Sequence, residues 1–325
     1  MEHDPYLNDP DRWGTSMAQM AEIMLPCLEA AGARSVVEVG AYAGDLTRVL
    51  VDWAGGFGAR VAAIDPSPQD GLVRLAGERR ELELIRETSL DALPRIDLPD
   101  AVVIDGDHNY YTVSEELRLI AERAGDASLP LVVFHDVCWP HGRRDDYFAP
   151  DLIPDDYRQP LAGSAGGIFP GDEGLRPGGL PYPRSAAREG GERNGVLTAA
   201  EDFAQSREGL RLAVIPVFFG FGVLWDLSAP WAPDVARVVD AWDRHPVLER
   251  LEANRVLHLA DKHVRTNELW EAQRRIARQE AVLRRLLESS AFSVAERLSR
   301  LRQSAGVATE QSVVSKDEIR RALAD

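Results

Sequence analysis

Short apolar runs alternate with stretches of helical periodicity between residues 35 and 134. The apolar runs are SVVEV (35–39), VAAI (61–64), LELI (82–85), AVVI (101–104) and LVVF (131–134). Uninterrupted apolar runs of this length are typical of strands that are buried on both faces. The pattern predicts five neighbouring strands of a parallel sheet.

The segments between these runs carry apolar residues at helical spacing, and they are Asp45 to Trp53, Gln69 to Glu78 and Thr112 to Ala124. Another amphipathic helix, from Thr15 to Ala31, precedes the first strand. Strands that alternate with crossover helices form a parallel sheet with helices on both faces. We therefore expect an α/β fold.

The alternation stops after Val137, and residues 139–195 are rich in glycine, proline and charge. A loop of this length is uncommon inside a compact domain and is usually functional, so we interpret it as a lid over a substrate site. Thr198 and Glu201 have the spacing of a capping box and predict the start of a helix. LRLAVIPVFF and GFGVLWDL then predict two strands that turn near residues 219–222 and close the sheet as an antiparallel hairpin.

From Ala229 onward the chain is rich in Arg, Glu, Leu and Ala at helical period. Leu269, Ile276 and Leu283 are seven residues apart, but two such steps are too few to establish a coiled coil. We expect a solvated helical extension that packs on the core or on a second copy of the chain. The sequence thus divides into a domain at 1–228 and a helical extension at 229–325, which we expect to mediate homo-oligomer formation.

Composition and charge exclude several classes of protein. The 325 residues are 45% hydrophobic and 28% charged, as in a globular protein with a sizeable core. A net charge of −16 repels polyphosphate, so nucleic acid is not an expected partner.

Cys27 and Cys138 lack the spacing of a zinc site or a disulfide framework. The first residues do not resemble a signal peptide and no apolar run is long enough for a membrane span, so we expect a cytoplasmic protein that does not enter membranes.

A glycine-containing turn follows the first predicted strand. Gly40 and Gly44 let the backbone turn sharply and approach a ligand, and the helix predicted from Asp45 begins directly after them. The turn lacks the GxGxxG pattern of dinucleotide-binding folds, which argues against NAD. Glu38 before the turn and Asp65 after the second strand are suited to a ligand with an ammonium group and ribose hydroxyls.

EVGAYAG, followed by AAIDP, resembles motifs I and II of the class I S-adenosylmethionine-dependent methyltransferases. The resemblance implies a Rossmann-like, seven-stranded, mostly parallel sheet that ends in an antiparallel hairpin, with S-adenosylmethionine as cofactor. It places Gly40 and Gly44 around the methionine portion, Asp65 on the ribose and Ser89, or Thr88, beside the adenine. The full set of cofactor contacts that it implies is Glu38, Gly40, Ala41, Tyr42, Gly44, Asp65, Pro66, Ser89 and Asp105.

Polar residues gather where the fourth and fifth predicted strands end, in IDGDHNYY and VVFHDVCWPH. A doubly wound sheet brings the carboxyl ends of adjacent strands together beside the ligand crevice. We therefore expect one cluster formed by Asp105, Asp107, His108, His135, Asp136 and His141.

These two motifs are similar to metal-dependent sugar O-methyltransferases of the macrocin and mycinamicin type, which are grouped with cephalosporin-hydroxylase-like sequences. The resemblance implies that Asp105 and Asp136 bind magnesium and that His108 is the catalytic base, with Asp105 and Asp136 assisting catalysis. His135 stands where the family usually has an oxygen ligand. Because magnesium prefers oxygen, a third ligand at His135 leaves open both the ligand set and the identity of the divalent metal.

The function implied is O-methylation of a small molecule, namely a hydroxyl of a sugar or of a glycosylated secondary metabolite, as in antibiotic biosynthesis. Arg143, Tyr147 and Asn194 in the 139–195 loop are candidate substrate contacts. An iron-dependent hydroxylase is an alternative, because His108, His135 and Asp136 imitate a 2-His-1-carboxylate site. A non-catalytic scaffold in a biosynthetic complex is another alternative, although it would not need the Asp/His cluster.

Overall fold

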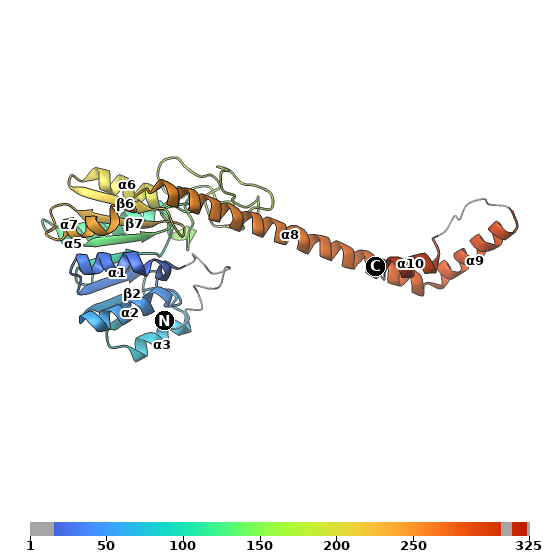
Figure 1. Cartoon of the computed structure of the whole chain (residues 1–325), viewed down its shortest axis with the longest axis horizontal. Helices are drawn as coiled ribbons and strands as arrows, with labels where there is room; N and C mark the ends of the chain where they lie inside the picture. The colour runs from blue at the N-terminus through green and yellow to red at the C-terminus, as the bar shows by residue number, and fades with distance from the viewer. Residues whose placement is uncertain (1–15, 307–313, 324–325) are drawn as a thin grey trace. The chain divides into compact units, whose positions relative to one another are not determined.

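The computed structural model describes residues 16–306 and 314–323 (Figure 1). It divides into two compact units, Met1–Asp261 and Lys262–Asp325. The predicted division lay between residues 228 and 229. The first unit extends further because α7 (Ala232–Val239) packs against α1 (Ala21–Ala30) and buries Val235 completely.

The first unit is built on one seven-stranded sheet in the order β3-β2-β1-β4-β5-β7-β6. Five strands are parallel, and they are β1 (Ser35–Val39), β2 (Arg60–Ile64), β3 (Leu82–Ile85), β4 (Ala101–Ile104) and β5 (Leu131–His135). β7 (Phe221–Asp226) pairs antiparallel with both β5 and β6 (Leu210–Ile215). The predicted sheet and its terminal hairpin are confirmed.

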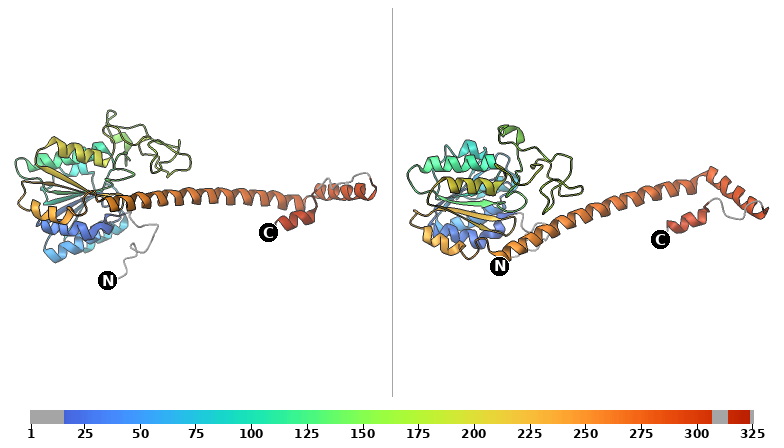
Figure 2. Two further views of the ribbon diagram at one scale, coloured as in Figure 1. Left: turned by 45° about the horizontal axis from the view of Figure 1, so that its top comes forward. Right: turned by 90° about the horizontal axis from the view of Figure 1, so that it is seen from above.

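Helices cover both faces of the sheet, as Figure 2 shows. One hydrophobic cluster joins the sheet to α1, α2 (Asp45–Phe57), α3 (Asp70–Glu78) and α7. A second joins its other face to α4 (Ser89–Ala92), α5 (Tyr110–Ala124) and α6 (Val196–Ser206). β4 and β5 are buried along their whole length, which explains why their sequences are apolar without alternation.

Helix boundaries differ from the predictions where a loop residue provides the cap. α5 begins at Tyr110 because the Asn109 side chain accepts a hydrogen bond from the N–H of Thr112. The capping box predicted at Thr198 is wrong. α6 begins at Val196, and Thr198 lies inside it and donates its hydroxyl to the carbonyl of Asn194.

The 139–195 loop contains one short 3-10 helix, η2 (Pro150–Leu152), and four isolated β-bridges. It is packed around Arg144, whose side chain is completely buried and donates to the carbonyls of Glu173 and Ala186. Its role as a lid remains a prediction.

The second unit consists of helices. α8 (Pro246–Glu288) begins in the first unit and continues into the second, where α9 (Ser290–Ser304) and α10 (Lys316–Ala322) follow. The side chain of Lys316 donates to the carbonyl of Leu287, and its N–H lies 3.2 Å from a carboxylate oxygen of Glu296. In the part of the chain that the structure describes, no helix has the length and apolar character needed to cross a membrane.

Candidate functional site

The loop between β1 and α2 passes directly over the end of β4. Gly40 has a φ of 85°, and a Cβ atom on it would lie 2.1 Å from the carbonyl oxygen of Asp105. Gly44 has a φ of 86° and is the N-cap of α2. Only glycine fits the first of these positions, so the predicted glycine turn brings the helix N-terminus next to Asp105.

Asp65, at the end of β2, holds this loop in place. One of its carboxylate oxygens accepts the N–H of Tyr42 and the other accepts the N–H of Ser67, each at 2.7 Å. Asp65 is 6% exposed. Each oxygen keeps a further lone pair, so a ribose hydroxyl can still donate to it.

Glu38 lies beneath the loop and is 2% exposed. Burial, together with the neighbouring carboxylates of Asp105 and Asp65, raises its pKa to about 8. Its Oε2 atom has no hydrogen-bond partner within the described structure. A buried carboxyl oxygen without a donor is costly, and a cationic ligand group above it would relieve that cost.

Ser89, the predicted adenine contact, donates its hydroxyl to the buried carboxyl of Glu116 on α5. Burial raises the pKa of Glu116 to about 8. The sequence analysis missed Glu116, because an acidic residue in an amphipathic helix is normally solvated.

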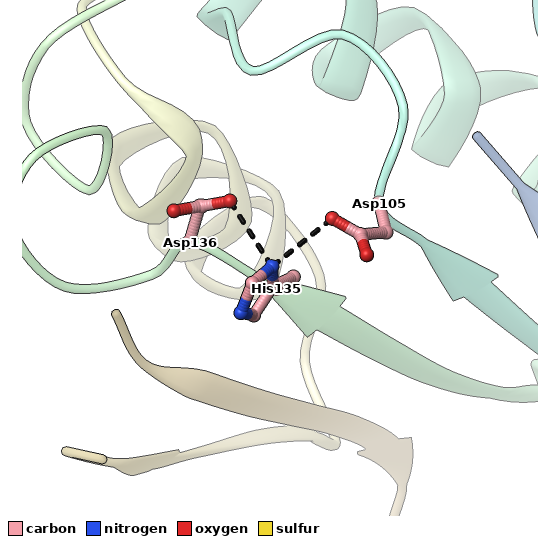
Figure 3. Close-up of side chains that lie close together, drawn as sticks. All are labelled: Asp105, His135 and Asp136. Atoms are coloured by element: carbon pink, nitrogen blue, oxygen red, sulfur yellow. Dashed lines mark hydrogen bonds and ion pairs between the residues drawn. The ribbon is translucent and has the colours of Figure 1, made fainter. Parts of the chain in front are cut away.

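Asp105, His135 and Asp136 form a group whose ligand atoms all lie within 4.8 Å of one another (Figure 3). His135 Nδ1 lies 3.1 Å from a carboxylate oxygen of Asp105 and 3.1 Å from one of Asp136. Its other nitrogen, Nε2, lies 2.9 Å from the carbonyl oxygen of Phe218. Asp136 has a φ of 57°, a left-handed conformation that is uncommon for a residue other than glycine.

The charges in this group stabilise one another. Burial alone would lower the pKa of His135, but the carboxylates of Asp136 and Asp105 outweigh burial and raise this pKa well above its usual value. Burial would raise the pKa of Asp136, but the positive charge on His135 and His108 lowers it. Without a bound cation, the group is thus a histidinium between two carboxylates.

His108, the predicted base, lies beside the same carboxylates. Its Nε2 is 3.4 Å from Asp105 and 3.3 Å from Asp136, and its ring stacks on His141 at 5.3 Å. Burial would lower its pKa, but Asp136 and Asp105 raise the pKa to about 9. His108 is therefore protonated at neutral pH in this arrangement.

Residues 145–148 of the loop bind residues 107–110, the turn that carries His108. The N–H of Asp146 donates to the carbonyl of His108 at 2.9 Å. The N–H of Phe148 donates to the side chain of Asp107 at 2.8 Å. In return the N–H of Tyr110 donates to the carboxylate of Asp145 at 2.7 Å, so the start of the loop fixes the His108 turn.

The three candidate substrate contacts all have partners within the protein. Tyr147 is completely buried and donates its hydroxyl to Asp145 at 2.8 Å. Arg143 donates to Thr198 and Glu201. Asn194 accepts the N–H of Asp145 and donates to two carbonyls of the loop. Their contact with a substrate remains a prediction. The ring of Tyr182 lies 5.3 Å from that of His141, which itself stacks on His108.

Residues 37–137 match a family model described as a methyltransferase domain. The match runs from β1 past Asp136 and so includes the glycine loop, Asp65 and the group of Asp105, His135 and Asp136, which we call the Asp/His cluster. Residues 37–137 are thus similar to a methyltransferase domain, and they contain β2 and β4, the neighbours of β1 in the sheet. No curated protein shows significant sequence similarity to the chain.

Solved structures that resemble the chain include several methyltransferases. PaMTH1 of Podospora anserina, solved with S-adenosylhomocysteine, is 15% identical with a TM-score of 0.39, over 69% of this chain and 89% of that chain. NcsB1, an O-methyltransferase of neocarzinostatin biosynthesis solved with S-adenosylmethionine and 2-hydroxy-5-methyl naphthoic acid, is 17% identical with a TM-score of 0.39, over 67% of this chain and 58% of that chain. An O-methyltransferase family protein of Burkholderia thailandensis is 12% identical with a TM-score of 0.39, over 69% of this chain and 62% of that chain. These TM-scores are too low to carry an inference about this chain.

Proposed function

We propose that the chain is an S-adenosylmethionine-dependent methyltransferase that transfers the methyl group to a hydroxyl oxygen of a small molecule, assisted by a divalent metal ion. The observation that carries the proposal is the position of Asp105, which belongs to the Asp/His cluster and whose backbone the glycine loop touches. A methyl donor held by the loop would therefore lie next to the group that binds the acceptor.

The residues around the loop fit S-adenosylmethionine. The orphaned Oε2 of Glu38 is suited to a cationic ligand, and the methionine portion carries an ammonium group. Asp65 has lone pairs left for the ribose hydroxyls. Ser89 and Glu116 form a buried polar pair at the start of α4, where an adenine edge would find a hydrogen-bond partner.

Asp105, His135 and Asp136 fit a divalent cation. Histidine ligands usually donate their second ring N–H to a carbonyl or carboxylate, and the contact of His135 Nε2 with Phe218 leaves Nδ1 for the metal. Two carboxylates suit magnesium, whereas an imidazole suits a transition-metal ion, so the proposal includes both. A bound cation supplies Lewis acidity, which lowers the pKa of a coordinated hydroxyl.

The chain's own residues then orient the acceptor and take up its proton. The acceptor oxygen attacks the methyl carbon of the sulfonium, the carbon–sulfur bond breaks, and its electron pair stays on sulfur as a thioether. His108 accepts the hydroxyl proton, for which it must first lose its own. His108 can release its own proton to solvent only when another positive charge lies beside Asp105 and Asp136, because these two carboxylates otherwise stabilise the protonated ring.

The acceptor that we propose is a sugar or a glycosylated secondary metabolite. An aliphatic hydroxyl is too weakly acidic to attack a sulfonium unaided, which is the chemical reason for a metal and a base in one site. The match of residues 37–137 to a methyltransferase domain favours methyl transfer over iron-dependent hydroxylation, and the Asp/His cluster argues against a pure scaffold.

The test measures metal binding independently of cofactor binding. Calorimetry with Mg²⁺ and Mn²⁺ is performed on the protein already saturated with S-adenosylmethionine, for the unaltered chain and for Asp136→Asn. We expect one divalent ion to bind the unaltered chain and a loss of binding of at least about 10-fold in the variant. Equal affinity in both proteins would refute the metal site but not the methyltransferase.

We also propose that the chain forms a homodimer through the stripe of α8 formed by Leu269, Ile276 and Leu283. Leu269 and Ile276 are more than half exposed. In a parallel pair of helices, each of these residues would contact the same residue of the second copy. Arg275 would face Glu280 of the second copy, since residues five apart at flanking positions form interhelical ion pairs.

Light scattering should report a dimer for the unaltered chain and for Arg278→Glu, and a monomer for Ile276→Glu. A monomeric unaltered chain at micromolar concentration would exclude the dimer.

A further inference from the structure

The loop between β6 and β7 holds an uncommon backbone conformation. Phe218 has a φ of 51° and Phe219 a φ of 68°. The left-handed conformation is unfavourable for a residue other than glycine. Such residues persist only where their surroundings hold them, and they are common at functional sites.

Glu252, on the second turn of α8, holds this loop in place with its carboxylate. Its carboxylate accepts the N–H of Phe218 at 3.1 Å and the N–H of Phe219 at 2.7 Å. Glu252 is 7% exposed and was not among the residues that the sequence singled out.

Arg255 completes the arrangement one turn further along α8. It donates to both carboxylate oxygens of Glu252, at 2.7 Å each, and its guanidinium lies 4.4 Å from the centre of the Phe219 ring. A bidentate pair of this kind fixes the carboxylate in one orientation. Glu252 and Arg255 therefore form a rigid support beneath the loop, which we call the α8 support.

The other side of the loop contacts the end of β5. The carbonyl of Phe218 lies 2.9 Å from His135 Nε2, and the carbonyl of Phe219 accepts the N–H of Cys138 at 2.7 Å. The loop thus lies between the α8 support and the histidine of the Asp/His cluster. All of these residues belong to the first compact unit.

We infer that Glu252 and Arg255 are positioning residues for His135, acting through the carbonyl of Phe218. This inference rests on the proposed function only in that His135 is taken as a metal ligand. A carbonyl held in place by two fixed N–H groups defines the orientation of the ring, in which Nε2 of His135 faces this carbonyl and Nδ1 faces Asp105 and Asp136. Partners of this kind typically contribute about 10- to 100-fold to metal affinity.

The inference gives α8 a part in the active site, although the helix lies outside the matched residues 37–137. A purely structural ion pair would stabilise the fold without affecting the ring of His135. The two roles therefore differ in what a substitution at Glu252 changes.

The experiment compares Glu252→Ala and Glu252→Gln with Glu249→Ala, which removes the same charge from an exposed position of the same helix. The ring nitrogens of ¹⁵N-labelled histidine are observed by NMR, with His135→Gln identifying the His135 signals. Mn²⁺ affinity is measured by calorimetry, and S-adenosylmethionine affinity reports whether each variant is folded.

We expect Glu252→Ala to shift the His135 Nε2 signal and to weaken Mn²⁺ binding by about 10- to 100-fold, with S-adenosylmethionine affinity within about twofold. Glu252→Gln keeps an acceptor oxygen and should lie between the unaltered chain and Glu252→Ala, and Glu249→Ala should match the unaltered chain. Unchanged His135 signals in both Glu252 variants would overturn the inference. If the unaltered chain binds no divalent ion, the proposed metal role fails, but the His135 signals still test the positioning.

If Glu252→Ala does not fold, Glu252→Gln and Arg255→Lys decide the question. Lys cannot form the bidentate contact, so Arg255→Lys should also shift the His135 signals. The absence of a shift in both folded variants would again overturn the inference.

Discussion

Individual residues of the site depend on their neighbours for their charge. Asp105 and Asp136 are ionised because His135 and His108 lie beside them, and the histidines are protonated because the carboxylates are there. Glu38 and Glu116 lack such a partner, and burial raises the pKa of each to about 8. At neutral pH, Asp105 and Asp136 are therefore ionised, whereas Glu38 and Glu116 are mostly protonated.

Asp136→Asn should lower the pKa of His108 from about 9 toward its usual value near 6.5, because Asp136 is the main group that raises it. An NMR titration of the His108 ring measures this pKa, with Asp126→Asn as a control for an exposed carboxylate. A His108 pKa near 9 in the Asp136 variant would contradict the charge pairing.

The stability of the chain should fall as the pH rises from 5 to 8, in part because of Glu116. Its folded-state pKa is raised to about 8, so in this range the folded chain binds more protons at Glu116 than the unfolded chain does. Urea unfolding of Glu116→Gln should show a slope of unfolding free energy against pH that is shallower by up to about 1.4 kcal/mol per pH unit. Parallel slopes in the two proteins would show that Glu116 ionises normally.

Among the elements, strands were predicted more accurately than helices. Every predicted strand of the parallel sheet lies within one residue of its observed boundaries, because continuous burial leaves a continuous apolar run. Helix starts depend on caps such as Asn109 and Gly195, which lie in loops and carry weaker signals. The capping box at Thr198 failed because the same spacing also occurs inside helices.

The sequence predicted that Asp105, His108, His135 and Asp136 would meet, since strand order places the ends of β4 and β5 side by side. It did not predict the contact of His135 with Phe218. Every residue has a backbone carbonyl, so no residue type in the sequence marks the one that contacts His135. The conformation of its loop also depends on Glu252, which is 34 residues away from Phe218 along the chain.

The 139–195 loop should loosen when Asp145 is removed. Its carboxylate accepts the N–H of Tyr110, the N–H of Gly195 and the hydroxyl of Tyr147. Asp145→Ala leaves these buried donors unpaired, and an unpaired buried donor costs about 1–3 kcal/mol. Asp145→Asn keeps the oxygen that accepts both N–H groups and should lose less stability in urea. Equal losses in the two variants would mean that the carboxylate, not the acceptor geometry, fixes the loop.

At the scale of the whole chain, charge is unevenly distributed between the two compact units. Residues 262–325 carry 13 Lys and Arg against 9 Asp and Glu, although the whole chain has a net charge of −16. The acidic excess therefore lies in the first unit, which contains the glycine loop, the Asp/His cluster and the α8 support.

A chain that ends at Asp261 should keep its ligand binding and lose its dimer. It retains Glu252 and Arg255 but lacks Leu269, Ile276 and Leu283. Light scattering and calorimetry with Mn²⁺ would measure the two properties on one sample. A dimeric truncated chain would place the interface in the first unit instead.

The most direct test of the central claim is calorimetric titration of the purified chain with S-adenosylmethionine, beside Asp65→Ala. Asp65 is proposed to hold the ribose and also fixes the glycine loop through the N–H of Tyr42. We expect one molecule to bind each unaltered chain and binding to weaken at least about 10-fold in the variant, since hydrogen bonds to a charged group contribute about 1.5–3 kcal/mol each. A folded, unaltered chain that binds no S-adenosylmethionine would contradict the account.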